Sequence, residues 1–172
     1  KIKNTLVSQN YVSKSLRPEI IDNYIFTLEN AFVFYSVNRY DIKGKEHLKT
    51  QGKYYIVDLG IRNYLLGFRN RDRGHILENV VYMELLKRGY DISIGKIQDK
   101  EVDFIATKSN KKTYIQVTES MIAEETRTRE LQPLKNIKDN YEKIVLTTDN
   151  LFANTDDEGI KIINLIDWLL EN

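Results

Sequence analysis

Acidic and amide side chains alternate with apolar residues along two nearby segments of the chain, 101–106 and 114–118. Alternation with period two predicts strands with two different faces, and the short polar turn between the segments predicts a β-hairpin. If Ser109 and Asn110 are the central turn residues, Asp103 faces Gln116 and Glu101 faces Thr118. The four polar side chains then share one face of the ribbon. The polar set is Glu101, Asp103, Gln116 and Thr118, and the apolar set predicted on the other face is Val102, Phe104, Ala106, Ile115 and Val117. Because buried carboxylates are costly unless they bind something, the polar face is predicted to be a site.

A third acid lies on the apolar side of a predicted helix that spans residues 75–88. The apolar residues that surround Glu78 on a helical wheel are Leu77, Val81, Tyr82, Leu85 and Leu86. A buried carboxylate without a partner is unfavourable or holds a proton, so Glu78 is expected to have a partner. Two kinds of partner remain open, a metal ion in a functional site or an arginine among Arg69, Arg71 and Arg73.

A helix glutamate, a strand aspartate and a Glu/Gln-x-Lys segment on the next strand could together hydrolyse a phosphodiester. Carboxylates coordinate Mg²⁺, the metal lowers the pKa of a bound water, and the lysine assists that water beside the developing anion. Glu78, Asp103 and Gln116 occupy these positions, and Thr118 stands where the lysine would be. The pattern resembles the PD-(D/E)XK nuclease-like superfamily, which implies that these three residues are catalytic and, if the site is active, bind Mg²⁺. Threonine supplies no basic nitrogen, and the nearest replacement lysines by sequence are Lys96, Lys100, Lys111 and Lys112.

The composition restricts the possible functions. The 172 residues are 41% hydrophobic, enough for a folded core, and the net charge of +1 gives no overall attraction to nucleic acid. There is no cysteine, and the two histidines, His47 and His75, are far apart, so thiolate and histidine metal sites are not expected. No apolar run approaches the roughly 20 residues of a membrane span, so a cytoplasmic location without a membrane partner is expected. The chain has no P-loop motif, so it is not expected to bind a nucleotide in that way. It starts at Lys1 without a methionine, which predicts a trimmed domain of a longer protein.

The elements that must position these residues form an α/β pattern. Upstream, a helix that begins near Pro18 runs into a basic hairpin around Gly44, which is the outline of a partial winged helix. Residues 1–66 are therefore predicted to be a partial winged-helix and connecting segment, and residues 67–172 a nuclease-like α/β domain. The elements predicted in the second part are helix 75–88, strands 90–94, 101–107 and 113–119, helix 124–137, strands 143–148 and 160–164, and helix 165–170. This αβββαβ order is that of the restriction-endonuclease-like core that the resemblance implies.

A second resemblance covers nearly the whole chain. Its segments are Tyr24-x-x-x-Leu28-Glu29, Arg39-Tyr40-Asp41-x-Lys43-Gly44-Lys45, Lys53-Tyr54-Tyr55-x-x-Asp58-x-Gly60, Gly74-x-x-x-Glu78-Asn79, Lys87-Arg88-Gly89-Tyr90, Glu101-Val102-Asp103-Phe104 and Ile115-Gln116-Val117. In these segments the chain is similar to the C-terminal domain of unknown function of bacterial and archaeal AAA-type ATPases. The resemblance implies an upstream ATPase domain, a winged-helix connector and a restriction-endonuclease-like domain, without a known substrate. Members of this family often carry Glu-x-Lys on the third strand, from which Gln116-Val117-Thr118 departs.

Charged and aromatic residues outside the acidic positions leave alternatives open. Four arginines could bind DNA phosphates or neutralise the nearby acids, namely Arg62, Arg69, Arg71 and Arg73. Four lysines of the upstream hairpin could contact DNA or the ATPase, or simply be solvated, namely Lys43, Lys45, Lys49 and Lys53. Tyr54, Tyr55 and Tyr64 could mark a partner interface or half-buried positions.

Taken together, these features favour a catalytically degenerate nuclease-fold module at the C-terminus of a AAA-type ATPase, which binds nucleic acid or docks partners. One alternative is an active Mg²⁺-dependent DNA endonuclease whose lysine or arginine comes from elsewhere in the chain. The other is a protein–protein adaptor with no nucleic-acid role. The expected partners are the upstream ATPase domain and DNA.

Overall fold

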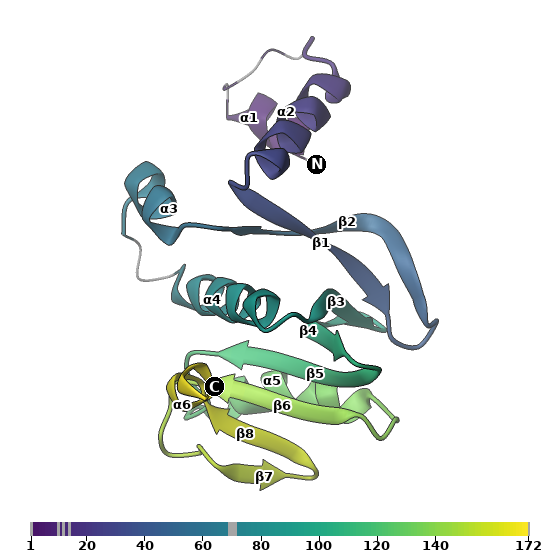
Figure 1. Cartoon of the computed structure of the whole chain (residues 1–172), viewed down its shortest axis with the longest axis vertical. Helices are drawn as coiled ribbons and strands as arrows, with labels where there is room; N and C mark the ends of the chain where they lie inside the picture. Colours follow the sequence, from purple (N-terminus) through teal and green to yellow (C-terminus); the bar gives the residue numbers. More distant parts are fainter. Residues whose placement is uncertain (1, 10, 12, 14, 69–71, 172) are drawn as a thin grey trace.

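A mixed sheet of eight strands organises the computed structural model, which describes residues 2–9, 11, 13, 15–68 and 72–171 (Figure 1). The strands are β1 (Phe34–Asp41), β2 (Glu46–Ile56), β3 (Asp91–Ile97), β4 (Lys100–Lys108), β5 (Lys111–Thr118), β6 (Glu142–Thr147), β7 (Thr155–Asp157) and β8 (Ile160–Asn164). The helices are α1 (Ile2–Ser8), α2 (Pro18–Asn30), α3 (Leu59–Leu66), α4 (Arg73–Lys87), α5 (Glu124–Asn136) and α6 (Leu165–Leu170). The prediction of a mixed α/β fold is therefore confirmed.

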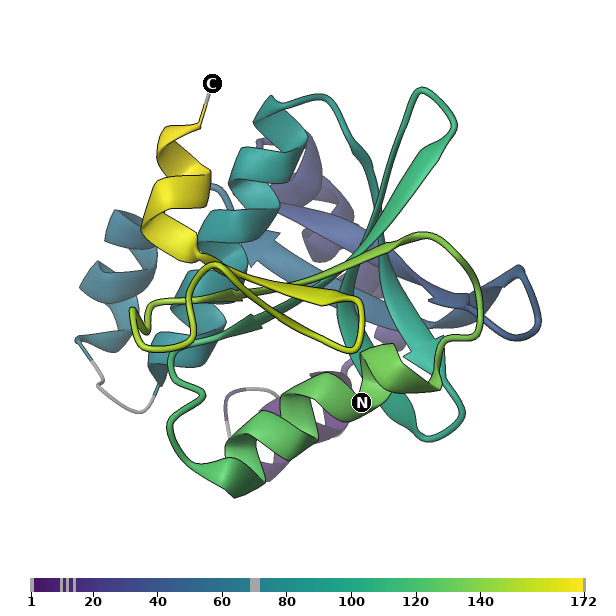
Figure 2. The same cartoon turned by 90° about the horizontal axis from the view of Figure 1, so that it is seen from below.

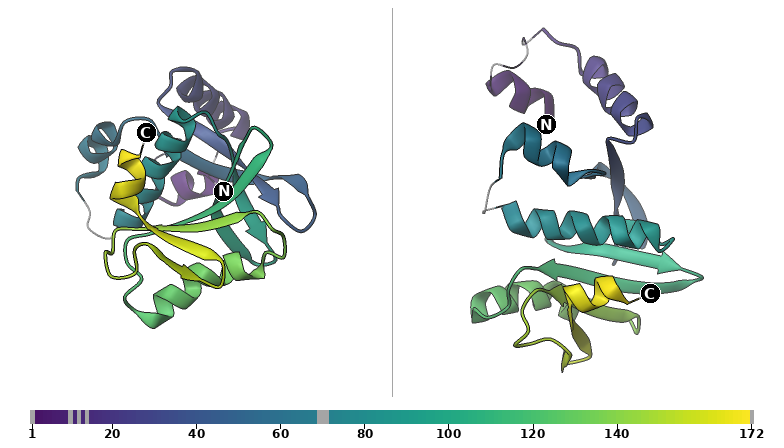
Figure 3. Two further views of the ribbon diagram at one scale, coloured as in Figure 1. Left: turned by 60° about the horizontal axis from the view of Figure 1, so that its bottom comes forward. Right: turned by 60° about the vertical axis from the view of Figure 1, so that its left-hand side comes forward.

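The sheet runs in the order β2-β1-β3-β4-β5-β6-β8-β7. The pairs β1–β2, β3–β4, β4–β5 and β7–β8 are antiparallel, whereas β1–β3, β5–β6 and β6–β8 are parallel. Strands from both sides of the predicted boundary at residue 66 thus belong to one sheet, because β1 pairs directly with β3. Figures 1 and 3 show α1 and α2 at one end of the molecule and the β7–β8 hairpin at the other.

The two faces of the sheet bury separate hydrophobic clusters. Figure 2 shows α4 and α6 on one side of the sheet and α5 on the other. Tyr82 and Leu85 of α4 belong to a cluster with Phe104 of β4, whereas Leu131 and Leu134 of α5 belong to the second cluster. Because successive strand residues point to opposite faces, the central strands supply apolar side chains to both clusters, which fits their nearly continuous burial.

The β4–β5 hairpin has the predicted turn. Ser109 and Asn110 have φ values of 50° and 63°, as the two central residues of a type I′ turn require. The ladder pairs Lys108 with Lys111 and continues to the pair Phe104 and Ile115. This register brings Asp103 level with Gln116, as the sequence predicted.

A bulge in β4 corrects one part of the predicted face pattern. Ser93 pairs with Ile105 but Gly95 pairs with Val102, so β4 has one extra residue between these two pairs. The extra residue reverses the alternation, and Val102 lies in the α5 cluster rather than beside Phe104 in the α4 cluster. A Cβ at Gly95 would lie 2.9 Å from the Val102 Cβ, so this close approach needs glycine.

A second irregularity sets the position of β2 at the edge of the sheet. The register of β1 with β2 shifts between Val37 and Arg39, and Gly52 lies opposite this shift. A Cβ at Gly52 would lie 1.7 Å from the Val37 carbonyl oxygen, a distance that no side chain can adopt. Beyond the shift, Lys53 pairs with Val37 and Tyr55 with Tyr35, so Lys53 and Tyr55 share one face of β2.

Candidate active site

The ammonium group of Lys53 lies at the centre of the acidic positions predicted from the sequence. Its Nζ is 2.7 Å from Glu78 Oε1, 2.6 Å from Glu101 Oε1 and 3.7 Å from Asp103 Oδ1. These four residues, from β2, α4 and β4, are the acid–lysine cluster. The Glu78 side chain is only 10% exposed and that of Asp103 12%, so their attraction to the lysine is weakly screened by water.

Tyr55 fixes the position of Glu78. Its hydroxyl donates a 2.5 Å hydrogen bond to Glu78 Oε1, the same oxygen that faces Lys53. The Tyr55 ring stacks on Tyr82 with centroids 4.3 Å apart and also packs against Phe104. Burial, together with the charge of Glu78, raises the pKa of Tyr55, so the phenol stays protonated and keeps donating.

Asn79 attaches α4 to the edge strand β2. Its side-chain nitrogen donates to the Ile56 carbonyl at 2.8 Å, and its oxygen accepts from the Ile56 N–H at 2.9 Å. The amide thus replaces the neighbouring strand that an edge residue lacks. This pair of bonds holds Glu78, one residue earlier on the helix, over Lys53.

Asp103 lies where β4 and β5 separate. The last ladder pair on this side is Phe104 with Ile115, and side chains take over the hydrogen bonds beyond it. Asp103 Oδ2 accepts from the Val117 N–H at 2.9 Å, while the Asp103 N–H donates to Gln116 Oε1 at 3.3 Å. The two predicted site residues Asp103 and Gln116 are therefore in direct contact.

Burial raises the pKa of Asp103 to about 7, and the nearby Glu78 carboxylate adds to this rise. Lys53 and the Val117 N–H act in the opposite direction without cancelling it. For Lys53 itself, burial lowers the pKa but the charges of Glu78 and Asp103 outweigh it, so the net pKa is raised. Lys53 is therefore a permanent cation in this arrangement, while Asp103 can hold a proton near neutral pH.

Gln116 points to the α5 side, where the sequence had given no partner. Its Nε2 donates to Glu130 Oε2 at 2.8 Å, and Glu130 also pairs with Arg129 at 2.8 Å. Glu130 is buried and was not predicted as part of the site. Both groups of the Gln116 amide are thus used within the protein.

Thr118 and Glu101 are not neighbours, although the extended hairpin register placed them opposite each other. The Thr118 hydroxyl donates to the Ser120 carbonyl at 3.2 Å, and Thr118 pairs with Thr147 of β6. Glu101 pairs in register with Lys96 of β3 and forms an ion pair with Arg39 at 2.5 Å. The strands separate before this point, so the four polar residues do not share a single face.

The predicted arginine strip does not contact Glu78 in the part of the chain that the structure describes. Arg62 pairs with Asp72 at 2.5 Å, and Arg73 pairs with Glu119 at 2.7 Å. Arg69 and Arg71 lie outside the described residues. Among the described residues, the lysine that binds Glu78 is Lys53, which the sequence interpretation had assigned to the upstream hairpin, and His75 Nδ1 lies 3.9 Å from the other Glu78 oxygen.

Two functional residues could have been found from a local signal. Lys53 and Tyr55 are two residues apart on a predicted strand, which places a cation and a hydroxyl donor on one face. Tyr55 is 4% exposed and so is buried within the protein, whereas Tyr64 is 88% exposed. The sequence alone does not tell which element that face of the strand contacts.

The acid–lysine cluster does not fit a resident Mg²⁺ in this arrangement. Carboxylate and amide oxygens are suitable ligands, but the Lys53 ammonium lies between the carboxylates that would have to share the metal. Asp103 Oδ2 and Gln116 Oε1 already accept backbone N–H groups. Among the described residues, no group of three or more acids or histidines is placed to hold a metal ion.

The structure thus defines an α/β protein with an internally neutralised acidic site at the separation of two central strands. The chain belongs to the family called domain of unknown function DUF4143, which matches residues 73–168. Residues 2–72 match a second family, domain of unknown function DUF8612. No solved structure matches the chain.

Two relatives of the chain are considerably longer than it is. An uncharacterised protein of Haemophilus influenzae is 42% identical over 171 residues, which cover 99% of this chain and 41% of the relative. An uncharacterised protein of Methanocaldococcus jannaschii is 32% identical over 176 residues, which cover 97% of this chain and 36% of the relative. The chain therefore spans about two fifths of the length of these relatives. None of the helices in the described ranges is long and apolar enough to cross a membrane.

Proposed function

We propose that the chain is a catalytically degenerate nuclease-fold module of a longer ATPase, and that it binds nucleic acid without cutting it. The observation that carries the proposal is the position of Lys53, whose ammonium neutralises Glu78 and Glu101 and approaches Asp103. In an active metal-dependent nuclease, these carboxylates would need to be available to a divalent cation.

The order of elements supports the nuclease fold. From Arg73 onwards the structure runs α4-β3-β4-β5-α5-β6, an αβββαβ order, with Glu78 on the first helix and Asp103 on the second strand. These are the positions of the acidic residues in the PD-(D/E)XK pattern that the sequence resembles. Thr118 at the lysine position is the departure from that pattern, and its hydroxyl bonds to a backbone carbonyl.

The protonation states at the site support the proposed absence of cutting. Lys53 has a raised pKa and no free electron pair at neutral pH, so it cannot accept a proton from water. Asp103 can hold a proton, but its Oδ2 is directed to the Val117 N–H. The acid–lysine cluster then stabilises the separation of β4 and β5 rather than activating a nucleophile.

The ATPase connection rests on the resemblance and on the greater length of the relatives. The N-terminal elements expose apolar side chains that a monomeric domain usually buries, among them Phe26, Phe32, Ile61, Tyr64, Leu65 and Phe68. Phe68 is 90% exposed. We assign this apolar surface to contact with another part of the same, longer polypeptide.

A binding and cleavage assay tests the proposal directly. The purified chain is mixed with labelled DNA at low salt, with and without Mn²⁺. The expected result is binding that weakens steeply with salt, needs no metal and leaves the DNA intact. Metal-dependent cleavage that is lost in Asp103→Ala would refute it.

One observation favours the active endonuclease as a second candidate. Lys53 supplies, from β2, the lysine that position 118 lacks, within 3.7 Å of Asp103. Cleavage abolished by Lys53→Met and restored in part by Lys53→Arg would support this candidate. A third candidate, an adaptor without a nucleic-acid role, is favoured by the exposed apolar residues of α3 and would show no DNA affinity even at low salt.

A further inference from the structure

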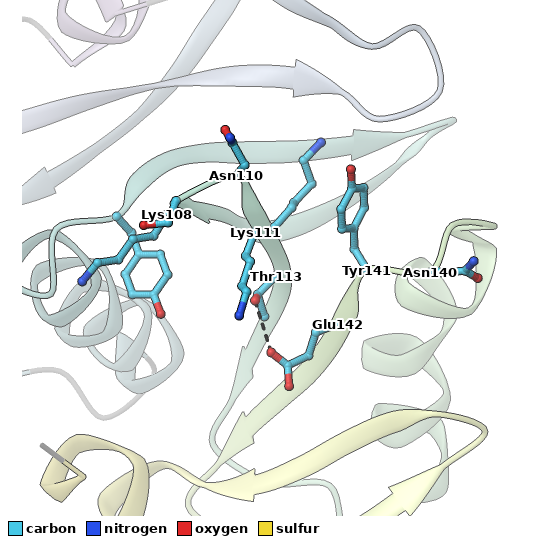
Figure 4. Close-up of a pocket in the computed structure, with 10 residues that line it drawn as sticks. Lys108, Asn110, Lys111, Thr113, Asn140, Tyr141 and Glu142 are labelled. Carbon is cyan, nitrogen blue, oxygen red and sulfur yellow. Dashed lines mark hydrogen bonds between the residues drawn. The ribbon is translucent and has the colours of Figure 1, made fainter.

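A basic pocket lies at the opposite end of β4 from the acid–lysine cluster. It has a volume of about 560 Å³ and is formed by the β4–β5 turn, the loop after α4 and the start of β6. Asp103 and Lys108 are five residues apart on β4, which corresponds to about 17 Å along a strand. Figure 4 shows Lys108 and Tyr141 on opposite sides of this pocket, with Lys111 between them.

Three lysines from one hairpin surround the pocket. Lys108 donates one N–H to the Arg88 carbonyl at 2.6 Å, which leaves two of its three donors for other partners. The Lys112 ammonium lies 5.2 Å from the ring centroids of both Tyr40 and Tyr141. Lys111 is exposed beside the positive-φ turn residues, and its side chain extends into the pocket (Figure 4).

The acid in the pocket is already paired. Glu142 Oε1 lies 2.8 Å from the Lys161 ammonium, and its Oε2 accepts from the Thr113 hydroxyl at 3.3 Å. The pocket lining therefore contains three lysines and one carboxylate, and that carboxylate is paired with a fourth lysine, Lys161. The local charge is positive although the chain as a whole carries only +1.

Two tyrosines complete the pocket and add flat apolar surface. Tyr141 is 46% exposed, and the Lys112 ammonium and the edge of Tyr114 hold its ring in place. Tyr90 lines the other side, 5.6 Å from the Lys108 ammonium. Proteins bind single-stranded nucleic acid by combining basic side chains, which contact the backbone, with aromatic rings on which the bases stack.

We propose that this pocket binds single-stranded nucleic acid, with Lys108 and Lys111 contacting phosphates and Tyr141 stacking on a base. The inference rests on the proposed nucleic-acid role but places it on a surface distinct from the acid–lysine cluster and the arginine strip. A duplex keeps its bases stacked inside, so only an unpaired strand can use the tyrosine ring. An acidic protein could form ion pairs with the lysines, but it would not stack on the Tyr141 ring as a nucleic-acid base does.

Fluorescence anisotropy with a labelled oligo(dT) of about 12 nucleotides tests the pocket. Wild type is expected to bind at low salt, and Lys111→Gln to weaken binding and reduce the slope of log K against log salt by about one. Tyr141→Leu is expected to weaken binding by about fivefold or more. Lys96→Gln is the matched control, because this exposed lysine on β3 lies at the acid–lysine end, and it should change affinity by less than about twofold.

The outcomes separate the pocket from the wider proposal. If wild type binds oligo(dT) but Lys111→Gln and Tyr141→Leu bind equally well, the assignment of binding to this pocket is wrong, while the proposed nucleic-acid role is retained. If wild type binds no DNA at low salt, both fail. Tighter binding to a duplex of the same length, or equal competition by polyglutamate, would overturn the assignment to single strands. Unchanged thermal melting of the variants confirms that any loss is not due to unfolding.

Discussion

Replacing Lys53 by methionine removes the only cation that reaches Glu78, Glu101 and Asp103 together in the described part of the chain. Methionine keeps most of the length and the apolar part of the side chain, so packing along β2 changes little. Glu101 retains Arg39, and Glu78 retains the Tyr55 hydroxyl. The main effect is therefore that the buried acidic groups of Glu78 and Asp103 lose the lysine ammonium that lies between them.

The size of the effect follows from burial. Removing one partner of a buried ion pair costs about 3–5 kcal/mol, and the lower end applies because the Lys53 side chain is 25% exposed. We therefore expect the free energy of unfolding to fall by about 3 kcal/mol at neutral pH. For a chain of this length, that corresponds to a melting temperature lower by about 6–12 °C.

Urea unfolding measured at about pH 7.5 and about pH 5 tests both the size and the origin of the effect. Without Lys53 the pKa of Asp103 rises further, so the folded variant gains more than wild type from protonation. The difference in stability should therefore shrink as the pH falls. Lys96→Met is the control, with an expected change within about 0.5 kcal/mol. A loss at Lys53 below about 1 kcal/mol, or one independent of pH, would refute the electrostatic account.

Three further predictions concern the same region. Burial, and to a smaller extent the charge of Glu78, raises the pKa of Asp103 from its ordinary value of 3.8 to about 7. The stability gained from protonated Asp103 is therefore fully present below pH 3.8 and is lost as the pH rises through 7. Asp103→Asn should therefore flatten the pH dependence of the free energy of unfolding between these two pH values, and an unchanged profile would contradict the raised pKa of Asp103. Gly52→Ala places a Cβ 1.7 Å from the Val37 carbonyl oxygen and should destabilise the protein by about 2 kcal/mol or more in urea unfolding, whereas Gly74→Ala, with open space around it, should not. Addition of about 5 mM Mg²⁺ should change the melting temperature by less than about 1 °C. By contrast, a bound ion present at a hundred times its Kd would raise the free energy of unfolding by about 2.7 kcal/mol.

The local elements were largely predictable because their causes are local. The β4–β5 hairpin follows from period-two alternation on either side of Ser109 and Asn110, and both residues adopt the positive φ that such a turn requires. Helix α4 follows from its apolar arc, and α2 begins at Pro18 as expected. The short strand β7 was missed because it has only three residues, and its pairing with β8 defines it.

The sequence by itself therefore determined that Glu78 lies on the apolar side of its helix and that Asp103 and Gln116 share one face of a hairpin, and all three are buried in the structure. Only the tertiary structure decided what they contact. Lys53 is 25 residues from Glu78 in the chain, and it reaches the site because Gly52 permits a register shift and Asn79 attaches α4 to β2. The bulge that moved Val102 likewise depends on the strand beside it. Periodicity reports which side of a strand a residue occupies, but the partner across that face is set by packing between elements distant in sequence.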